Sequence, residues 1–184
     1  MIDRWCHVTN KMRSLKDEWG GIDKNIFNLV ITLNVLYVPT TGSCEGHIDH
    51  GAPAPWVKVT AAGEPNTKKN SETYRKWQQK NLQLRKKTND FLEMFYQNRN
   101  VRNNVRIIIE KGYVGFWIHN GGIAYKKWRN EMMSRVVMRE KGKYVSNASV
   151  SMRGKIKRAK TLPLYQKEMK LFARFVKKKA RALT

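Results

Sequence analysis

A β-hairpin is predicted by residues 105–120, which read VRIIIEKGYVGFWIHN. Valine and isoleucine alternate with other residues over 105–109, and residues 113–118 are aromatic and β-branched, as strands usually are. Lys111 and Gly112 supply a turn between the two halves. Since neighbouring strands joined by a short turn pair in antiparallel fashion, the chain is expected to contain an antiparallel sheet.

A buried helix is predicted over residues 22–37, where apolar residues recur three and four positions apart after a Gly20-Gly21 break. The uncharged stretch 25–44 is long enough to cross a bilayer. Its asparagines and Pro39 would leave polar groups in hydrocarbon, so a core helix ending near Pro39 is favoured. After it we expect a turn over 39–43, an irregular segment over 51–55 and a short strand over 56–61.

A long helix is predicted after Asn70 and Ser71, which are N-cap candidates. It carries a mostly aromatic stripe at three- and four-residue spacing, interrupted by Asn81 and Thr88. Such a stripe packs either within the subunit or partly against another copy of the chain. The candidate interface residues are Tyr74, Trp77, Leu84, Phe91 and Phe95.

The last third of the chain predicts a helix over 125–136, an irregular stretch over 142–160 and a closing helix. Thr161 is the expected N-cap of the closing helix, with Pro163 in its first turn. Apolar residues follow one face of this helix and cations the other. The fold class is therefore α+β, a small antiparallel sheet packed with long amphipathic helices and a basic C-terminal helix, in a single domain of residues 1–184.

Positive charge dominates the composition. The 184 residues include 37 Lys and Arg against 14 Asp and Glu, a formal charge of +23. Residues 121–184 hold 19 of those cations and 3 Glu, a net +16. Such an excess is typical of proteins that contact nucleic acid, anionic lipid or an acidic protein surface. A membrane-surface role is disfavoured because the chain has other core elements for its amphipathic helices to pack against.

The candidate polyanion contacts lie near the end of the chain. Five cations fall within the eight residues 153–160, where they would match phosphate spacing rather than base identity. The cationic face of the closing helix extends this surface. The predicted nucleic-acid contacts are Arg153, Lys155, Lys157, Arg158, Lys160, Lys170, Arg174, Lys177, Lys178 and Arg181.

Cys44, His47 and His50 form a cluster of the kind that binds metal, because thiolate and imidazole suit zinc. Structural zinc usually needs a fourth protein ligand, which Cys6-His7 or His119 would have to supply from elsewhere in the chain. The alternative is an ordinary polar loop with two histidines. We expect the polar loop, with no metal and no cofactor.

The sequence lacks the usual signatures of enzymes. It contains no Walker loop, no dinucleotide-binding glycine pattern and no nucleophile elbow. A His-Asn-His nuclease is disfavoured because no histidine follows His119. Two cysteines exclude a disulfide scaffold and indicate a reducing compartment. Charges in the first twenty residues argue against a secretory signal. We therefore expect a non-enzymatic protein, with a zinc-dependent nuclease as the remaining enzymatic alternative.

The order of these elements resembles the head-to-tail joining proteins of tailed bacteriophages, the neck or tail-completion class. The resemblance rests on Pro39-x-Thr41-Gly42 after a helix, on the Tyr113 strand that ends in His119-x-Gly121, and on a late loop before the closing helix. It covers about half of the chain. His119 stands where that family has an acid, Ser43-Cys44-Glu45 replaces a basic continuation, and residues 66–100 are an insertion.

This resemblance implies a small α+β subunit that forms a ring at the portal, seals the packaged DNA and joins the tail. It implies a virion protein, present in the host cytoplasm during assembly, whose partners are copies of itself, the portal and the tail. The alternative function is a sequence-tolerant nucleic-acid-binding protein, ribosome-associated or DNA-packaging, in which cations hold phosphate and aromatic side chains stack on bases.

Overall fold

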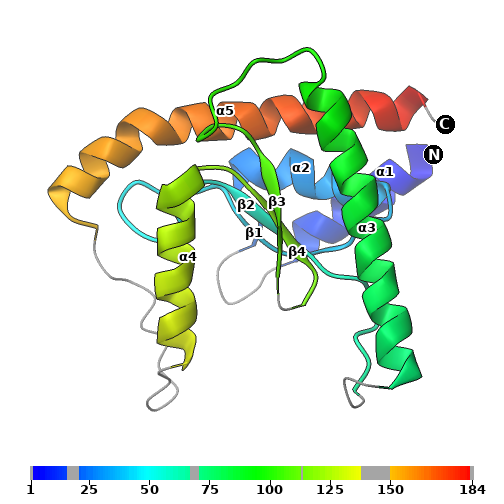
Figure 1. The fold of residues 1–184 in the computed structure, drawn as a ribbon. Helices are drawn as coiled ribbons and strands as arrows, with labels where there is room; N and C mark the ends of the chain where they lie inside the picture. The colour runs from blue at the N-terminus through cyan, green and yellow to red at the C-terminus, as the bar shows by residue number, and fades with distance from the viewer. Residues whose placement is uncertain (1, 16–20, 67–70, 113, 138–149, 183–184) are drawn as a thin grey trace.

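The computed structural model describes residues 2–15, 21–66, 71–112, 114–137 and 150–182. Within these ranges it has five helices and one four-stranded sheet (Figure 1), which confirms the α+β fold class. The helices are α1 (Ile2–Ser14), α2 (Lys24–Val35), α3 (Glu72–Tyr96), α4 (Gly122–Val137) and α5 (Met152–Ala182). The strands are β1 (Thr40–Cys44), β2 (Trp56–Val59), β3 (Ile108–Lys111) and β4 (Phe116–His119).

The sheet is antiparallel throughout, in the order β1-β2-β4-β3, and the predicted hairpin is its β3-β4 pair. Both strands begin three residues later than predicted, and Lys111, expected in the turn, is the last residue of β3. Because side chains alternate along a strand, paired residues share one face of the sheet. Val57 pairs with Ile118 and Val59 with Phe116, and all four are buried on the core face. The opposite face carries polar and aromatic side chains, among them His119 at the end of β4.

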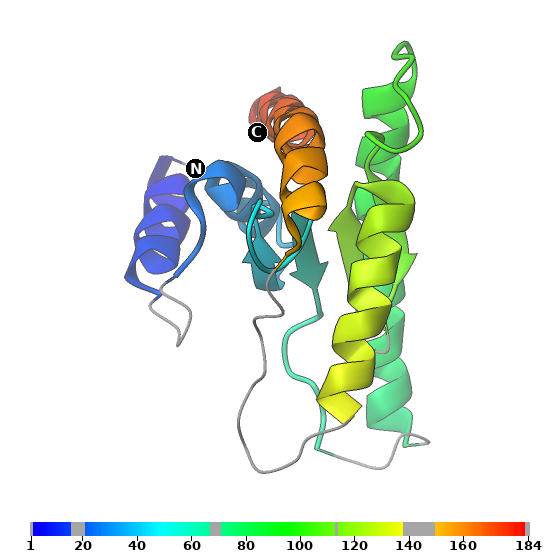
Figure 2. The same cartoon turned by 90° about the vertical axis from the view of Figure 1, so that its left-hand side faces the viewer.

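The main core lies between the sheet and the helices α2 and α5. Its buried side chains come from all helices except α4 and include Leu33, Phe95, Phe172 and Val176. Figure 2 shows α1 and α2 on one side and α3 and α4 on the other, with the strands between them. Helix α5 crosses the whole molecule (Figure 1) and packs most extensively on α2.

Helix α3 begins as predicted. Ser71 is its N-cap, and its hydroxyl accepts a hydrogen bond from the Tyr74 N–H at 3.2 Å. Asn81, a polar interruption of the stripe, accepts a bond from the Ala61 N–H at 2.8 Å, while the Trp77 indole donates to the Ala61 carbonyl at 2.9 Å. The aromatic stripe therefore packs within the chain. Of the candidate interface residues, Leu84 is half-buried, and those buried in this subunit are Tyr74, Trp77, Phe91 and Phe95.

Residues 39–43 are not the predicted turn, because 40–44 form the edge strand β1. Its register shifts between Thr40 and Gly42, which marks a bulge. The Trp56 ring lies beside Gly42, where a Cβ would be in ordinary van der Waals contact with it at 3.4 Å. β-branched threonines and this aromatic neighbour favour the extended backbone over a turn.

Helix α5 begins at Met152, nine residues before the predicted N-cap. Ser151 caps it by accepting the Gly154 N–H at 3.2 Å, and Thr161 lies inside the helix, where its hydroxyl donates to the Lys157 carbonyl at 3.0 Å. Pro163 is therefore an interior proline, which removes one helical hydrogen bond. Of the predicted irregular stretch, residues 152–160 are helical, and 142–149 lie outside the described residues.

Helix α1 has no counterpart in the sequence-based prediction. It packs on α2 through Val8 and Met12, which are buried one helical turn apart. Among the helices of the described ranges, none is long and apolar enough to cross a membrane.

Candidate functional site

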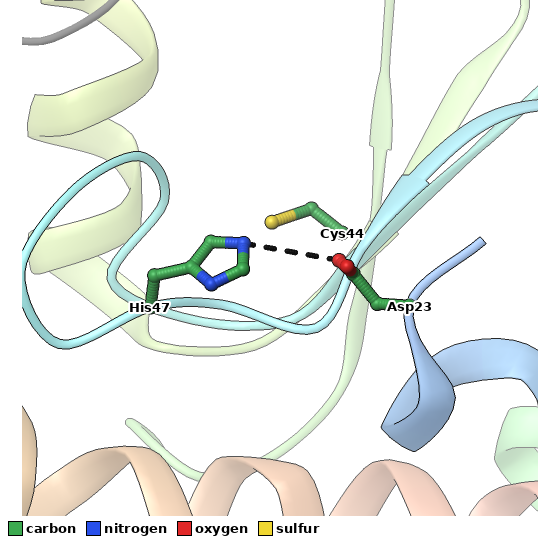
Figure 3. A group of neighbouring side chains, drawn as sticks. All are labelled: Asp23, Cys44 and His47. Carbon is green, nitrogen blue, oxygen red and sulfur yellow. Dashed lines mark ion pairs between the residues drawn. The ribbon is translucent and has the colours of Figure 1, made fainter. Parts of the chain in front are cut away.

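Three potential metal ligands converge where β1 leaves the sheet. Asp23 directly precedes α2, Cys44 ends β1, and His47 lies in the loop that follows. One ligand atom from each lies within 4.8 Å of the others, and the His47 Nε2 is 3.8 Å from the Asp23 Oδ2. Figure 3 shows the three side chains turned toward one another. We call these residues the Asp-Cys-His cluster.

Two crossed hydrogen bonds hold the segments of this cluster together. The Asp23 carboxylate occupies the N-cap position of α2 but makes no side-chain cap there; its Oδ2 accepts the Glu45 N–H at 2.9 Å instead. The Glu45 Oε2 in turn accepts the Asn25 N–H at 2.8 Å in the first turn of α2. Each segment thus supplies an acceptor for a backbone donor of the other, which fixes the start of α2 against the end of β1.

A glycine makes the turn between Cys44 and His47 possible. Gly46 has φ +79, and a Cβ there would lie 2.9 Å from the Ala54 carbonyl carbon and 2.7 Å from a Leu162 methyl carbon. No other residue fits both the backbone conformation and the space. The Gly46 N–H points at the cysteine and donates to its Sγ at 3.3 Å.

Burial, together with the nearby Asp23 carboxylate, raises the pKa of the Cys44 thiol to about 12, against the lowering effect of the Gly46 hydrogen bond. The thiol of the metal-free chain is therefore neutral at physiological pH. Cys6, the other cysteine, is free and exposed on α1.

His50 does not join the cluster predicted from sequence, because its ring stacks on that of His47 with centroids 4.2 Å apart and planes inclined by 19°. Its Nδ1 bonds to the Asp49 carboxylate at 2.6 Å, and this bond lowers the pKa of Asp49. His119 is also elsewhere, fully buried with its Nε2 3.0 Å from Glu110. Asp23 is instead the third potential ligand beside Cys44 and His47. Its separation from Cys44 in the chain gave no local spacing that would reveal it.

Arg158 of α5 holds the loop after the cluster. Its Nη1 lies within hydrogen-bonding distance of the carbonyl oxygens of His47, His50 and Gly51, at 3.0, 2.9 and 3.1 Å. Burial lowers the pKa of this guanidinium, but it remains charged. Arg158, predicted as a phosphate contact, is thus bound to backbone oxygens of its own chain.

The other predicted phosphate contacts are spread along α5. Lys155 is half-buried, Lys177 lies over the Trp5 ring at 5.2 Å, and Arg181 is exposed. The remaining cations are exposed on the side opposite the buried face of the helix, together with Lys167, which was not among the predicted contacts. We call this set the basic stripe: Arg153, Lys157, Lys160, Lys167, Lys170, Arg174 and Lys178.

The basic stripe has little acidic neutralisation from its own helix. Glu168 is the one acidic residue in the sequence of α5, against twelve cations. It is buried, and Arg99 from the segment after α3 binds it with N–O distances of 2.9 and 2.8 Å. The one carboxylate of α5 is therefore buried and already paired with Arg99, so it does not neutralise the exposed cations of the stripe.

Comparison with protein-family models, with curated proteins and with solved structures found no match. The resemblance to the phage head-to-tail joining proteins stays a prediction.

Proposed function

We propose that this protein binds nucleic acid without sequence preference, through the basic stripe of α5. The observation that carries this proposal is the separation of charge on that helix: seven exposed cations share one side, and the one acid is buried and paired with Arg99. From Arg153 to Lys178 the stripe extends along about 38 Å of helix. A continuous row of cations matches the regular charge of a phosphate backbone and reads no base edge.

A nucleic acid suits this surface better than a membrane does. The apolar side of α5, which would have to enter the lipid, is already packed into the core through Met169, Phe172 and Val176. A membrane-bound amphipathic helix needs that side available. The large apolar side chains that α5 leaves exposed are Met152, Ile156 and Leu164 in its N-terminal half, and from Lys167 to Lys178 the stripe offers charge alone.

The decisive experiment compares two variants that lose the same residue types from different helices. One is K160Q/K167Q/K170Q/R174Q on α5, and its matched control is R75Q/K76Q/K80Q/K86Q on α3; all eight side chains are exposed. Affinity for random-sequence duplex DNA is measured by fluorescence anisotropy as a function of salt. If all four α5 cations contact phosphate, the slope of log affinity against log salt falls by about 3 to 4 in the α5 variant.

The control variant separates local contact from overall charge. We expect it to keep most of the wild-type slope, because α3 is not part of the stripe. Equal losses in the two variants would mean that net charge alone drives binding, and a wild-type slope in the α5 variant would overturn the assignment to this helix. Equal affinity for scrambled and unrelated sequences is also expected, since phosphate contacts carry no sequence information.

A head-to-tail joining subunit is our second proposal. The fold supports it, because an antiparallel sheet flanked by long helices is the architecture that the resemblance implies. The aromatic residues expected at its ring interface are buried in the subunit, so a ring would use other surfaces. Mass photometry with and without DNA tests this: a closed oligomer of one size without DNA favours the joining role, and a monomer that gathers only on DNA favours the first proposal.

A further inference from the structure

We propose that Asp23, Cys44 and His47 bind a zinc ion, with a fourth coordination position facing solvent. This inference is independent of nucleic-acid binding. It rests on three side chains from two distant segments whose ligand atoms already lie within 4.8 Å of one another. Tetrahedral zinc with ordinary bond lengths places its ligand atoms about 3.3 to 3.6 Å apart. The 3.8 Å between the His47 Nε2 and the Asp23 Oδ2 is close to that range.

The donor set selects the type of metal. One thiolate, one imidazole and one carboxylate make a mixed sulfur, nitrogen and oxygen site, which suits zinc and does not suit magnesium or calcium, whose ligands are oxygens. The two anionic ligands would balance the charge of a divalent cation. Because the surrounding chain is strongly basic, a neutral site costs less electrostatically than a cationic one would.

The groups behind the ligands hold them in this arrangement without a metal. The Gly46 N–H donates to the Cys44 Sγ, and the Glu45 N–H donates to the Asp23 carboxylate. Arg158 binds the His47 carbonyl and so fixes the backbone that carries the imidazole. Hydrogen bonds of this kind orient ligands and tune their affinity for a metal. Contacts from α5, from the start of α2 and from the Gly46 turn thus preorganise the loop around the cluster.

The accessible side of the cluster lies toward His47 and Asp23, whose side chains are 26% and 33% exposed. Three protein ligands with one accessible position are the pattern of zinc sites that keep a water or accept a ligand. His50 stands beside this opening, but its ring lies against that of His47 and nearly parallel to it, so the two imidazoles do not converge on one ion. Among the residues that the structure describes, the site therefore has three protein ligands.

Cobalt(II) is the probe for the test, because a thiolate bound to it gives a charge-transfer band that reports sulfur coordination directly. The full chain is treated with a chelator, desalted and titrated with cobalt and then with zinc. We expect one equivalent of cobalt to produce the band and zinc to displace it. Zinc content of protein purified without chelator, measured by mass spectrometry of the metal, should also approach one per chain.

Five variants assign the ligands. C44S should abolish the charge-transfer band, and H47Q and D23N should weaken cobalt binding by about tenfold or more. C6S and H50Q are the matched controls, one cysteine and one histidine outside the site, and should bind as the wild type does. Since His47 is partly exposed, H47Q tests the site even if C44S fails to fold; circular dichroism before titration identifies such a failure.

The proposal is overturned if the wild-type chain binds neither metal stoichiometrically, if C44S keeps the band, or if C6S or H50Q loses binding as H47Q does. A thermal readout supports the same decision without spectroscopy. Zinc should raise the melting temperature of the wild type and of H50Q by similar amounts, and it should raise that of H47Q clearly less. Equal shifts in H50Q and H47Q would remove His47 from the site.

Discussion

Arg99 and Glu168 join the segment after α3 to the middle of α5. The Arg99 Nη2 donates to both carboxylate oxygens of Glu168, at 2.9 and 2.8 Å, and its guanidinium also lies over the Phe95 ring at 4.3 Å. Glu168 is 5% exposed, so its charge depends on this partner. The pair also anchors the helix that carries the basic stripe.

Removing the two partners should therefore have unequal effects. Arg99→Ala leaves a buried carboxylate without its cation and should lower the free energy of unfolding by about 2 kcal/mol or more. Glu168→Gln keeps a neutral acceptor for Arg99 and should cost about 1 kcal/mol. Urea denaturation followed by circular dichroism measures both values. A smaller loss for Arg99→Ala than for Glu168→Gln would contradict this account of the pair.

Two glycines with similar backbone angles form a second matched comparison. Gly115 has φ +74, and a Cβ there would lie 2.0 Å from the Val59 carbonyl oxygen, whereas Gly63 has φ +71 with nothing within 4 Å. Gly63→Ala should cost only the left-handed backbone penalty of about 1 to 2 kcal/mol. Gly115→Ala adds a collision with strand β2 and should cost about 3 to 5 kcal/mol. Similar unfolding free energies for the two variants would exclude the close approach of Gly115 to β2.

Stability should fall in acid because of His119. Burial lowers its pKa below the ordinary value of 6.5, although hydrogen bonds to Asn120 and Glu110 act in the opposite direction. Arg129 pairs with the same Glu110, which adds a positive charge against protonation. His119 therefore binds a proton less readily in the folded chain than in the unfolded chain. Stability from this residue is complete above about pH 6.5 and is lost as the pH falls, by at most about 1.4 kcal/mol per pH unit.

His119→Gln tests this linkage through a slope rather than through absolute stability. Unfolding free energies of both proteins are measured from about pH 8 to about pH 5, and the variant should lose less stability over that interval. If His119→Gln showed the full wild-type dependence, the acid sensitivity would belong to other groups.

Arg158 should control the order of the loop over 47–51. Arg158→Lys keeps the charge but loses the planar group that reaches three carbonyl oxygens together. Amide hydrogen exchange is the measurement, and the His47 N–H, which donates to the Ala52 carbonyl at 2.8 Å, is the reporter. We expect exchange about tenfold faster, equivalent to about 1.4 kcal/mol of local stability. Lys157→Gln, at the neighbouring exposed cation, should leave it unchanged.

The sequence predicted the elements whose signals are local. Ser71 and the aromatic spacing after it placed α3, and alternation with a glycine turn placed the β3-β4 hairpin. Helix α1 was missed although Trp5, Val8 and Met12 carry a helical spacing, because a few apolar residues in a mostly polar stretch form a weak pattern. Helix α1 is stabilised by packing on α2, and local sequence patterns do not reveal such packing.

Elements that depend on distant partners were harder to predict. The threonines of β1 form a strand because β2 pairs with them through hydrogen bonds. Without knowledge of that pairing, the local sequence of residues 39–43 predicts a turn. Pro163 suggested a helix start, but the helix begins at Met152 despite the lost hydrogen bond. Its first turns are held by the Ser151 cap and by the Arg158 bonds to the loop over 47–51. Asp23 joins the Asp-Cys-His cluster only because the start of α2 meets the end of β1, so local spacing predicted only Cys44 and His47.

Repulsion between like charges along α5 destabilises this helix, so its helical structure depends on packing against the rest of the chain. Arg153 and Lys157, Lys170 and Arg174, and Arg174 and Lys178 are each one turn apart and repel one another by a few tenths of a kcal/mol. Dissolved ions screen that repulsion and also compete for phosphate. Added salt should thus stabilise the fold and lower the affinity for the polyanion. The salt concentrations at which the chain is most stable are therefore those at which it binds its polyanion most weakly.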